Sequence, residues 1–459
     1  MNGGAPSRGI ALRRLETRAS ARLSIEQAIG PAVQPLWQRL GNGPLLLAEL
    51  EAEFEDTLPQ LYAFVQRLWA NCGLALGWPA GDPELEIEPA VAGEVLKLGV
   101  GMPTDRWKVS RFAQLHVDDS GGTLIETPRI PVITRILKPR AAAVLVALAV
   151  PRTAAEMLAE LRWRSTSKEL LEMLALLWSA GVITRCDAEG LSEEDAQPEL
   201  LQWEPHDLAF HMRSRQGRHS YPMGASFRFR GRLDPHPAVK PNPWRERAIA
   251  LPKFDLAAVA ARDPPFTTVL EFRRSIRAMD FSRPISLAQI AEFLFRTARV
   301  RHRFNTEIGE FTSRPYPNGG ASYEFELYLT INACAGLERG FYYYDPEGHT
   351  LSLVRRPNED TEALLDDAWV SSARQCRPQV LITIASRFHR VSWKYSGMAY
   401  AAQLKNAGVL YQTFYLVATA MNLAGCGLGL GDAARFARLT EISNFEEGSV
   451  GEFMLGTPA

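Results

Sequence analysis

The stretch Phe272-Arg273-Arg274-Ser275-Ile276-Arg277 decides how the C-terminal half of this chain is interpreted. It places three guanidinium groups and a hydroxyl within five residues, and Ser286 follows as the N-cap of a predicted helix. Arginine binds phosphate through bidentate, charge-assisted hydrogen bonds, so the cluster suits a phosphate group. Taken alone, the same residues also fit a solvated basic surface.

The next motif along the chain is the loop Arg314-Pro315-Tyr316-Pro317-Asn318-Gly319-Gly320-Ala321, followed by a predicted strand over 323–331. Its prolines fix the loop, and its glycines let the backbone approach a flat ligand closely. A simple turn before a strand is the alternative interpretation. A hairpin is predicted next, with arms over 340–344 and 350–354.

A third motif precedes a long uncharged run. The predicted strand 379–385 leads into Ser392-Trp393-Lys394-Tyr395-Ser396-Gly397, and 406–431 then contains no charged residue. This run is long enough to span a bilayer. The run nevertheless contains polar residues, and no second apolar segment that could span a membrane accompanies it. These features favour a helix buried on all sides inside a large core.

The uncharged run ends in Gly425-Cys426-Gly427-Leu428-Gly429-Leu430-Gly431. Glycine at every second position is not the dinucleotide-binding fingerprint, because the order strand, Gly-x-Gly-x-x-Gly, helix is missing. The pattern fits a tight backbone path beside a cofactor, or a turn from helix to strand.

The N-terminal half repeats one pattern. Leu47-Ala48-Glu49-Leu50 and Leu158-Ala159-Glu160-Leu161 each begin a pair of helices that a glycine closes, and a short strand follows at 74–78 and 182–186. Helix, turn, helix and β wing is the order of a winged-helix unit, and two copies indicate duplication. A hairpin with arms over 109–117 and 123–127 precedes the second copy.

Winged-helix units most often bind DNA, but some clamp an extended peptide beside the wing. The predicted second helix, 167–180, carries one lysine against two glutamates, which does not suit a reader of the major groove. Peptide binding and a purely structural role both remain open.

The composition of the chain limits the classes of protein to which it can belong. The chain has 459 residues, 46% of them apolar and 22% charged, which is typical of soluble globular proteins. A net charge of -1 gives no electrostatic reason to expect binding to nucleic acid or to a membrane. The five cysteines are scattered without a C-x-x-C pair, which favours a reducing cytoplasm. No apolar segment follows the arginines between 8 and 22, so no secretory signal is expected.

These patterns divide the chain into four parts. We expect a first winged-helix-like module over 1–105, a hairpin with a second module over 106–200, a Pro/His/Arg-rich connector over 201–250 and a catalytic domain over 251–459. The histidines of the connector have spacings that fit no common zinc pattern, so no metal site is expected.

The order of the motifs resembles that of the nitroreductase-like flavoproteins. The motifs are most similar to those of the SagB-type dehydrogenases, which form thiazoles and oxazoles in ribosomally made peptides. They are Arg-Arg-Ser-x-Arg, Pro-Asn-Gly-Gly, Lys-Tyr before a long helix, and Cys-Gly-x-Gly. The resemblance implies an α+β protein. Its C-terminal nitroreductase-like fold would have an antiparallel-rich sheet flanked by helices, preceded by two winged-helix-like peptide-clamp modules.

The resemblance also implies FMN, with each flavin at the interface of a homodimer. It assigns the phosphate and ribityl chain to Arg273, Arg274, Ser275 and Arg277. It lays Pro317, Asn318, Gly319 and Gly320 along one side of the isoalloxazine ring, and Gly427 and Gly429 along the other. Lys394 and Tyr395 match the catalytic Lys-Tyr pair.

The chain departs from the family pattern at three places. Asn318 stands where serine is usual, and Ala401 and Ala402 stand where relatives often have arginine. No basic residue follows Leu455-Gly456, so the phosphate would depend on the Arg273 cluster.

The implied activity is oxidation of thiazoline or oxazoline rings in a precursor peptide, next to a cyclodehydratase. The ring loses a proton from the former α-carbon and a hydride from the adjacent methylene to the flavin, which dioxygen reoxidises. Tyr395 as a phenolate beside Lys394, or neutral Lys394 itself, would take the proton. Alternatives are another nitroreductase-like flavin enzyme acting on small molecules, and a non-catalytic peptide- or DNA-binding protein with a relict flavin fold.

Overall fold

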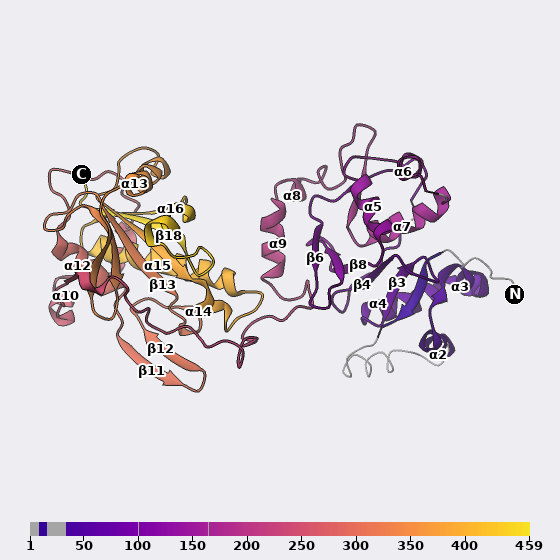
Figure 1. Ribbon diagram of the computed structural model, residues 1–459, viewed down its shortest axis with the longest axis horizontal. Helices are drawn as coiled ribbons and strands as arrows, with labels where there is room; N and C mark the ends of the chain where they lie inside the picture. Colours follow the sequence, from indigo (N-terminus) through magenta and orange to yellow (C-terminus); the bar gives the residue numbers. More distant parts are fainter. Residues whose placement is uncertain (1–8, 16–33, 100, 164) are drawn as a thin grey trace. The chain divides into compact units, whose positions relative to one another are not determined.

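The computed structural model describes residues 9–15, 34–99, 101–163 and 165–459. The chain divides into two compact units, Met1–Tyr221 and Pro222–Ala459, so the division falls inside the predicted connector 201–250 (Figure 1). Most of the arginine-rich stretch 8–22, on which the expected absence of a secretory signal depends, lies outside the described residues.

The N-terminal unit mixes short strands and helices. In chain order its described elements are β1 (Ala11–Arg14), α2 (Gln34–Asn42), β2 (Leu45–Leu46), α3 (Leu47–Glu53), α4 (Leu58–Ala70), β3 (Leu74–Trp78), β4 (Leu85–Pro89), β5 (Arg106–Val109), β6 (Gln114–Val117), β7 (Thr123–Glu126), β8 (Val132–Ile136), α5 (Pro139–Ala147), α6 (Ala154–Leu161), α7 (Ser167–Ser179), β9 (Ile183–Cys186), α8 (Pro198–Leu201) and α9 (Pro205–Arg213).

One antiparallel sheet organises this unit, with strand order β2-β1-β3-β4-β8-β7-β6. It takes strands from both sides of the predicted boundary at 105/106, because β4 pairs with β8. The helices α4 and α7, one from each repeat, both pack on β3 and β4. Their apolar faces share one core in which Trp69, Leu76 and Leu174 are fully buried.

Several expected elements of this unit are confirmed. The strand over 74–78 is β3, and the helix expected over 167–180 is α7, which starts with a capping box between Thr166 and Glu169. The first arm of the predicted hairpin is shorter than expected, because Val109 ends β5 and pairs with β9 in a separate two-stranded sheet. The order α5, α6, α7, β9 is that of a winged-helix unit, an assignment that stays a prediction.

The C-terminal unit is built around a larger sheet. Its elements are β10 (Ala248–Ala250), α10 (Leu256–Arg262), α11 (Phe266–Phe272), α12 (Leu287–Thr297), β11 (His302–Thr306), β12 (Gly309–Ser313), β13 (Phe325–Ile331), β14 (Gly340–Asp345), β15 (Thr350–Arg355), α13 (Glu359–Ser371), β16 (Val380–Arg387), α14 (Phe388–Ser392), α15 (Ala399–Ala420), β17 (Ala424–Leu428), α16 (Ala433–Thr440) and β18 (Glu447–Gly456).

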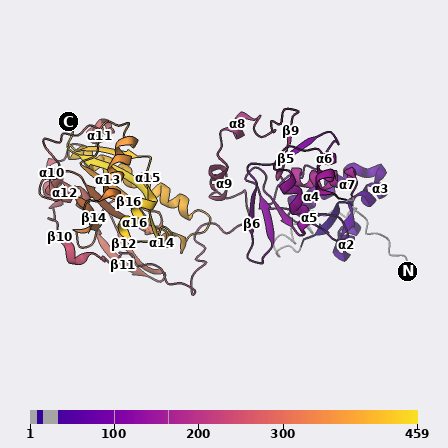
Figure 2. The ribbon, with the colours of Figure 1, turned by 45° about the horizontal axis from the view of Figure 1, so that its top comes forward.

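Helices cover both faces of this sheet, whose strand order is β10-β15-β14-β13-β16-β18-β17 (Figure 2). On one face, α12 and α15 bury Phe293 and Phe414 against Phe453. On the other face, α13 and α16 bury Leu365 and Phe436. All pairings of the sheet are antiparallel, so the α+β fold expected from the motifs is confirmed.

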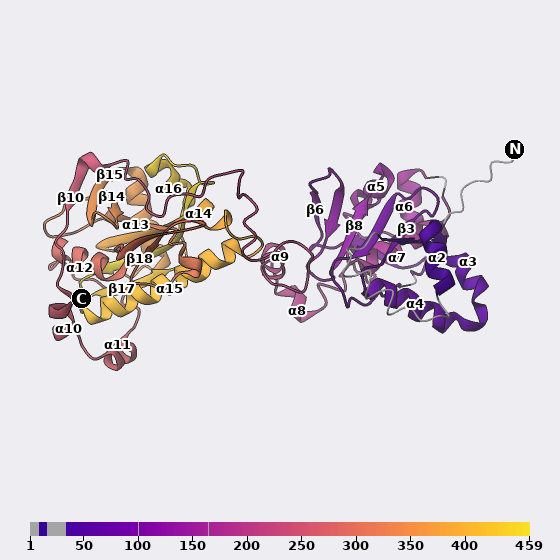
Figure 3. The same ribbon diagram turned by 90° about the horizontal axis from the view of Figure 1, so that it is seen from below.

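The uncharged run forms the C-terminal part of helix α15 and strand β17, and Figure 3 shows α15 lying along β17 and β18. Leu410 and Phe414 are fully buried, whereas Leu404 is 39% exposed and Gln412 is exposed. The expectation of a helix buried on all sides was wrong for the single chain, because apolar composition does not distinguish a core from an exposed apolar face. Over the described residues, no helix has both the length and the apolar character needed to cross a membrane.

Candidate functional site

Two clusters of the residues singled out by sequence lie beside α15. The first is centred on Tyr415. The guanidinium carbon of Arg273, just after α11, lies 5.3 Å from the centre of the Tyr415 ring. The Ser275 hydroxyl lies 2.9 Å from the Tyr415 hydroxyl. The Gly427 N–H of β17 donates to the same Tyr415 oxygen at 2.8 Å. We call Arg273, Ser275, Tyr415 and Gly427 the Tyr415 cluster.

The arginines of this loop carry uncompensated charge. Within the described part of the chain, no hydrogen bond or ion pair to a protein group engages the side chains of Arg273, Arg274 or Arg277. Arg273 and Arg277 are half-buried, and Arg274 is exposed. Closely spaced guanidinium groups without carboxylate partners favour binding of an anion, and a phosphate suits their planar donors.

The second cluster holds the glycine loop. Asn406 of α15 accepts a hydrogen bond from the Gly319 N–H at 3.0 Å and donates to Glu324 at 2.9 Å. Asn318 donates to the other oxygen of Glu324 at 2.8 Å. Burial raises the pKa of Glu324, and the two amide donors oppose that shift. These buried bonds fix the loop against α15.

The proposed catalytic pair lies over this loop. The Lys394 ammonium is 3.4 Å from the Gly320 carbonyl oxygen and 5.1 Å from the centre of the Tyr395 ring. Gly320 has φ +64°, and a Cβ there would overlap the Tyr395 hydroxyl and lie 2.9 Å from Lys394 Nζ. Glycine is therefore required at this position both for backbone conformation and for space. We call Lys394, Tyr395, Gly320 and Asn406 the Lys394 cluster.

Two further segments surround the Lys394 cluster. Phe311 of β12 lies 5.6 Å from Lys394 Nζ, and its hairpin with β11 projects from the unit (Figure 1). The segment after Gly224 bonds to the backbone beside the pair, because the Phe227 N–H donates to the Lys394 carbonyl at 3.1 Å. The sequence assigned this segment to a connector and gave no sign that it borders the candidate site.

The two clusters occupy opposite flanks of α15. Asn406 and Tyr415 are nine positions apart, which at about 100° per residue is half a turn around the helix, with an axial rise of about 13 Å. Pro317 is exposed at the start of the glycine loop, and Gly429 is exposed just after β17. No described contact joins Gly429 to either cluster. The structure thus forms two half-sites from the residues that the sequence grouped together.

Glu452 of β18 lies beside the glycine-rich end of β17, where a Cβ at Gly431 would overlap its carboxylate. Burial raises the pKa of Glu452 from its ordinary value of 4.5 to about 7. Ionisation therefore costs more in the folded than in the unfolded chain. Protonation of Glu452 therefore favours the folded state over the unfolded state. This contribution to the free energy of unfolding is fully present below about pH 4.5 and is lost as the pH rises to about 7.

Glu452→Gln is accordingly expected to stabilise the protein by about 3 kcal/mol at pH 8 and to have little effect at pH 4.5. The free energy of unfolding in urea, measured at both pH values, checks this. The exposed Glu446→Gln serves as a control with no pH-dependent difference. A Glu452→Gln effect of equal size at both pH values would contradict the assigned titration.

Comparisons with known proteins agree with the motifs. Residues 107–220 match the family model described as cyanobactin oxidase ThcOx, and residues 270–457 match the model of the nitroreductase family. The putative nitroreductase MJ1384 of Methanocaldococcus jannaschii is 28% identical over 161 residues, covering 35% of this chain and 76% of that protein. The resemblance to SagB-type, nitroreductase-like oxidases is therefore confirmed.

Two solved structures are among those similar to the chain. A putative nitroreductase from Ralstonia eutropha has a TM-score of 0.38 and 21% identity, covering 50% of this chain and 95% of that chain. A chain of the E. coli microcin synthetase McbBCD complex has a TM-score of 0.36 and 19% identity, covering 57% of this chain and 94% of that chain.

Proposed function

We propose that this chain, whose C-terminal unit is a nitroreductase-family domain, is an FMN-dependent dehydrogenase that oxidises thiazoline or oxazoline rings in a ribosomally made peptide. The observation that carries the proposal is the Lys394 cluster, in which an amine and a phenol lie together over a loop glycine that has no side chain of its own. The match of residues 107–220 to the cyanobactin oxidase model supports a peptide substrate.

The residues present fit FMN. Arg273 and Arg277 are half-buried guanidinium groups that have no hydrogen bond or ion pair to a protein group among the described residues, which suits a phosphate. The Ser275 hydroxyl and the Gly427 N–H, both bonded to Tyr415, lie in the same cluster as Arg273. Gly319 and Gly320 expose backbone without side chains, which suits a flat ring. Bound FMN would supply a hydride acceptor next to the substrate ring.

The chain itself must remove a proton from the azoline carbon that was the peptide α-carbon. The Tyr395 hydroxyl and the Lys394 amine are both close enough to Gly320 to face a substrate above the loop. Lys394 either assists Tyr395 as a neighbouring cation or takes the proton itself. The buried Phe311 ring borders Lys394, with its centre 5.6 Å from Lys394 Nζ.

A homodimer accounts for the two half-sites. The Tyr415 and Lys394 clusters lie on opposite flanks of α15, and the outward face of the helix exposes Leu404, Gly408 and Gln412. A second copy packed on this face would bring the Lys394 cluster of one chain toward the Tyr415 cluster of the other. We therefore include a homodimer in the proposal, acting in the cytoplasm with a cyclodehydratase that supplies azoline rings.

Leu416→Glu is expected to convert the dimer into monomers. Leu416 is only half-buried in the single chain and lies on the outward face of α15, so a charge there is tolerated by the monomer but desolvated in the dimer. Sedimentation velocity should show the mass halved. Val146→Glu, which changes a 76% exposed residue of the N-terminal unit, should leave the mass unchanged. A dimeric Leu416→Glu protein would exclude α15 as the interface.

A small-molecule reductase is the second candidate, favoured by the likeness to a protein named as a putative nitroreductase. The two are separated by incubating the flavin-loaded protein with an azoline-containing peptide in air, without nicotinamide. Formation of the aromatic ring under these conditions supports the proposal. Reduction of a quinone or nitroaromatic by a nicotinamide donor, with no peptide oxidation, would replace it. Protein that binds no flavin would exclude both.

A further inference from the structure

Strand β6 leaves an open edge on the sheet of the N-terminal unit. It is the last strand in the order β2-β1-β3-β4-β8-β7-β6, and it pairs only with β7 among the described strands. Leu115 and Val117 of this strand are each 63% exposed. Proteins usually shield such edges with charge, proline or a covering segment, because they accept an additional strand.

The outward backbone groups of β6 can be identified from the register. The Asp118 N–H bonds to the Gly122 carbonyl at 2.9 Å, and hydrogen-bonded pairs alternate along an antiparallel ladder. His116 and Gln114, opposite Leu124 and Glu126, therefore carry the next bonds to β7. The N–H and C=O groups of Leu115 and Val117 point to the open edge, where no described residue bonds to them.

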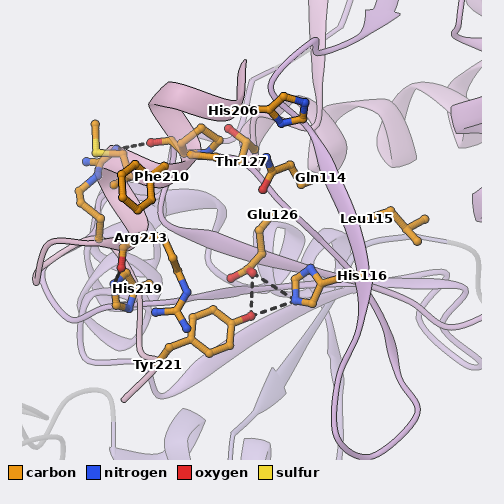
Figure 4. A pocket seen from close by; sticks show the side chains of 14 residues that line it. Gln114, Leu115, His116, Glu126, Thr127, His206, Phe210, Arg213, His219 and Tyr221 are labelled. Carbon is orange, nitrogen blue, oxygen red and sulfur yellow. Dashed lines mark hydrogen bonds and ion pairs between the residues drawn. The ribbon is translucent and has the colours of Figure 1, made fainter. Parts of the chain in front are cut away.

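A cavity of about 770 Å³ lies beside this edge, between β6 and helix α9. Figure 4 shows His116, Glu126 and Tyr221 pointing toward one another in it. The Tyr221 hydroxyl donates to Glu126 at 2.7 Å, and His116 Nε2 lies 3.0 Å from that hydroxyl and 3.4 Å from the carboxylate. Phe210 and Met212 of α9 add apolar wall.

Cationic and imidazole groups dominate the polar part of the wall. It contains the side chains of His206, Arg213, Arg218 and His219. Among the described residues that line the cavity, Glu126 is the one carboxylate, and Tyr221 and His116 already engage it. Arg218 Nε and His219 Nδ1 are buried without a hydrogen-bond partner among these residues. The cavity therefore complements a negatively charged occupant.

We propose that β6 and this cavity dock an extended, acidic segment of the substrate peptide, which adds to the sheet as a further strand. This rests on the proposed function, which makes the substrate a peptide. Successive side chains of a strand point to opposite faces. Those on the face of Gln114 and His116 enter the cationic cavity, and those on the face of Leu115 and Val117 meet apolar side chains. The segment that fits best alternates acidic and apolar residues.

The test uses the full-length protein and a fluorescein-labelled peptide in which valine and glutamate alternate over about ten residues, long enough to cover β6. Fluorescence anisotropy should show binding, and the peptide with lysine in place of glutamate should bind at least tenfold more weakly. Equal affinity for the two peptides would overturn the assigned charge preference and the proposal with it.

Two double variants isolate the backbone contribution. Leu115→Pro with Val117→Pro removes the N–H groups that face the open edge and leaves the backbone groups that bond to β7, and proline is tolerated on edge strands in that orientation. We expect affinity to fall about tenfold, as for the loss of two backbone hydrogen bonds. Leu115→Val with Val117→Ile keeps both N–H groups and the apolar surface, and should bind like the wild type. Unchanged binding in the proline variant would exclude strand addition.

If the proline variant does not fold, hydrogen exchange of the wild-type protein tests the proposal instead. The peptide should slow exchange of the Leu115 and Val117 amides and leave His116, already bonded to β7, unchanged. Absence of this pattern would overturn the proposal. A protein mass that rises with concentration in the wild type and falls in the proline variant would also overturn the proposal, because the β6 edge would then pair with a second copy of the chain.

Because binding is measured without turnover, this proposal and the proposed function fail separately. Peptide binding with no azoline oxidation leaves the docking edge in place and removes the activity. Azoline oxidation in a protein that fails the binding tests removes only the docking edge.

Discussion

Lys394→Ala and Tyr395→Phe should each slow azoline oxidation by roughly 10²–10⁴-fold, the usual contribution of a positioned base, while FMN stays bound. Both side chains lie over Gly320, in the half-site opposite the Tyr415 cluster, so neither contributes to the assigned phosphate contacts. Single-turnover rates and the flavin content of each variant measure the two effects independently.

The double variant tests whether the two residues act together, and the pH–rate profiles of the single variants tell which of them takes the proton. The two losses should not add, because one residue is proposed to act through the other. If Tyr395 is the base, Lys394→Ala should also shift the limb on which the rate rises with pH to higher pH. If Lys394 is the base, Tyr395→Phe should lower the rate and leave the position of that limb unchanged. Lys253→Ala, at an exposed lysine of the same unit, is the control. Near wild-type turnover in both single variants would remove the pair from the mechanism.

Replacing both Arg273 and Arg277 with alanine should weaken FMN binding by roughly two to four orders of magnitude. Each arginine is proposed to make a charge-assisted bond to the phosphate, worth about 1.5–3 kcal/mol. Equilibrium dialysis followed by flavin absorbance measures the dissociation constant.

The matched control for the phosphate site is Arg283→Ala. Arg283 is 74% exposed and already forms an ion pair with Asp280 at 2.7 Å, so its removal should leave FMN affinity unchanged. Thermal unfolding without added flavin should show that both proteins remain folded. Full flavin occupancy in the Arg273 and Arg277 double variant would exclude the assigned phosphate site.

Local pattern was enough to predict many elements. The strand β3, the hairpin of β14 and β15, and the Ser286 cap of α12 follow from turn residues, alternation and capping chemistry within a few positions of one another. Lys394 and Tyr395 could be proposed as a pair for a similar reason, since the residues that make their motif are adjacent in the chain.

Residues that connect distant segments were not predicted. Tyr415 joins Ser275, 140 positions away, to Gly427, and Asn406 joins Gly319, 87 positions away, to Glu324. Each lies in the uncharged part of α15, whose composition indicates only burial. A single polar side chain in such a run shows that a partner is needed, but it does not say which one.

Composition also failed to distinguish a helix buried on all sides from a helix with one exposed face. The uncharged part of α15 reads as a core helix because it lacks charge, yet Gly408 and Gln412 are exposed in the single chain. Likewise, the two repeats read as separate modules because each is locally complete. The pairing of β4 with β8 that joins their strands in one sheet depends on contacts between segments far apart in sequence.

The mass of a cyclodehydrated peptide, recorded with and without the flavin-loaded protein in air, tests the central claim most directly. The account predicts that each azoline ring loses two hydrogen atoms in the presence of the protein, and that Lys394→Ala largely prevents the loss. A peptide whose mass does not change, with protein that holds FMN and is folded, would contradict the proposed activity.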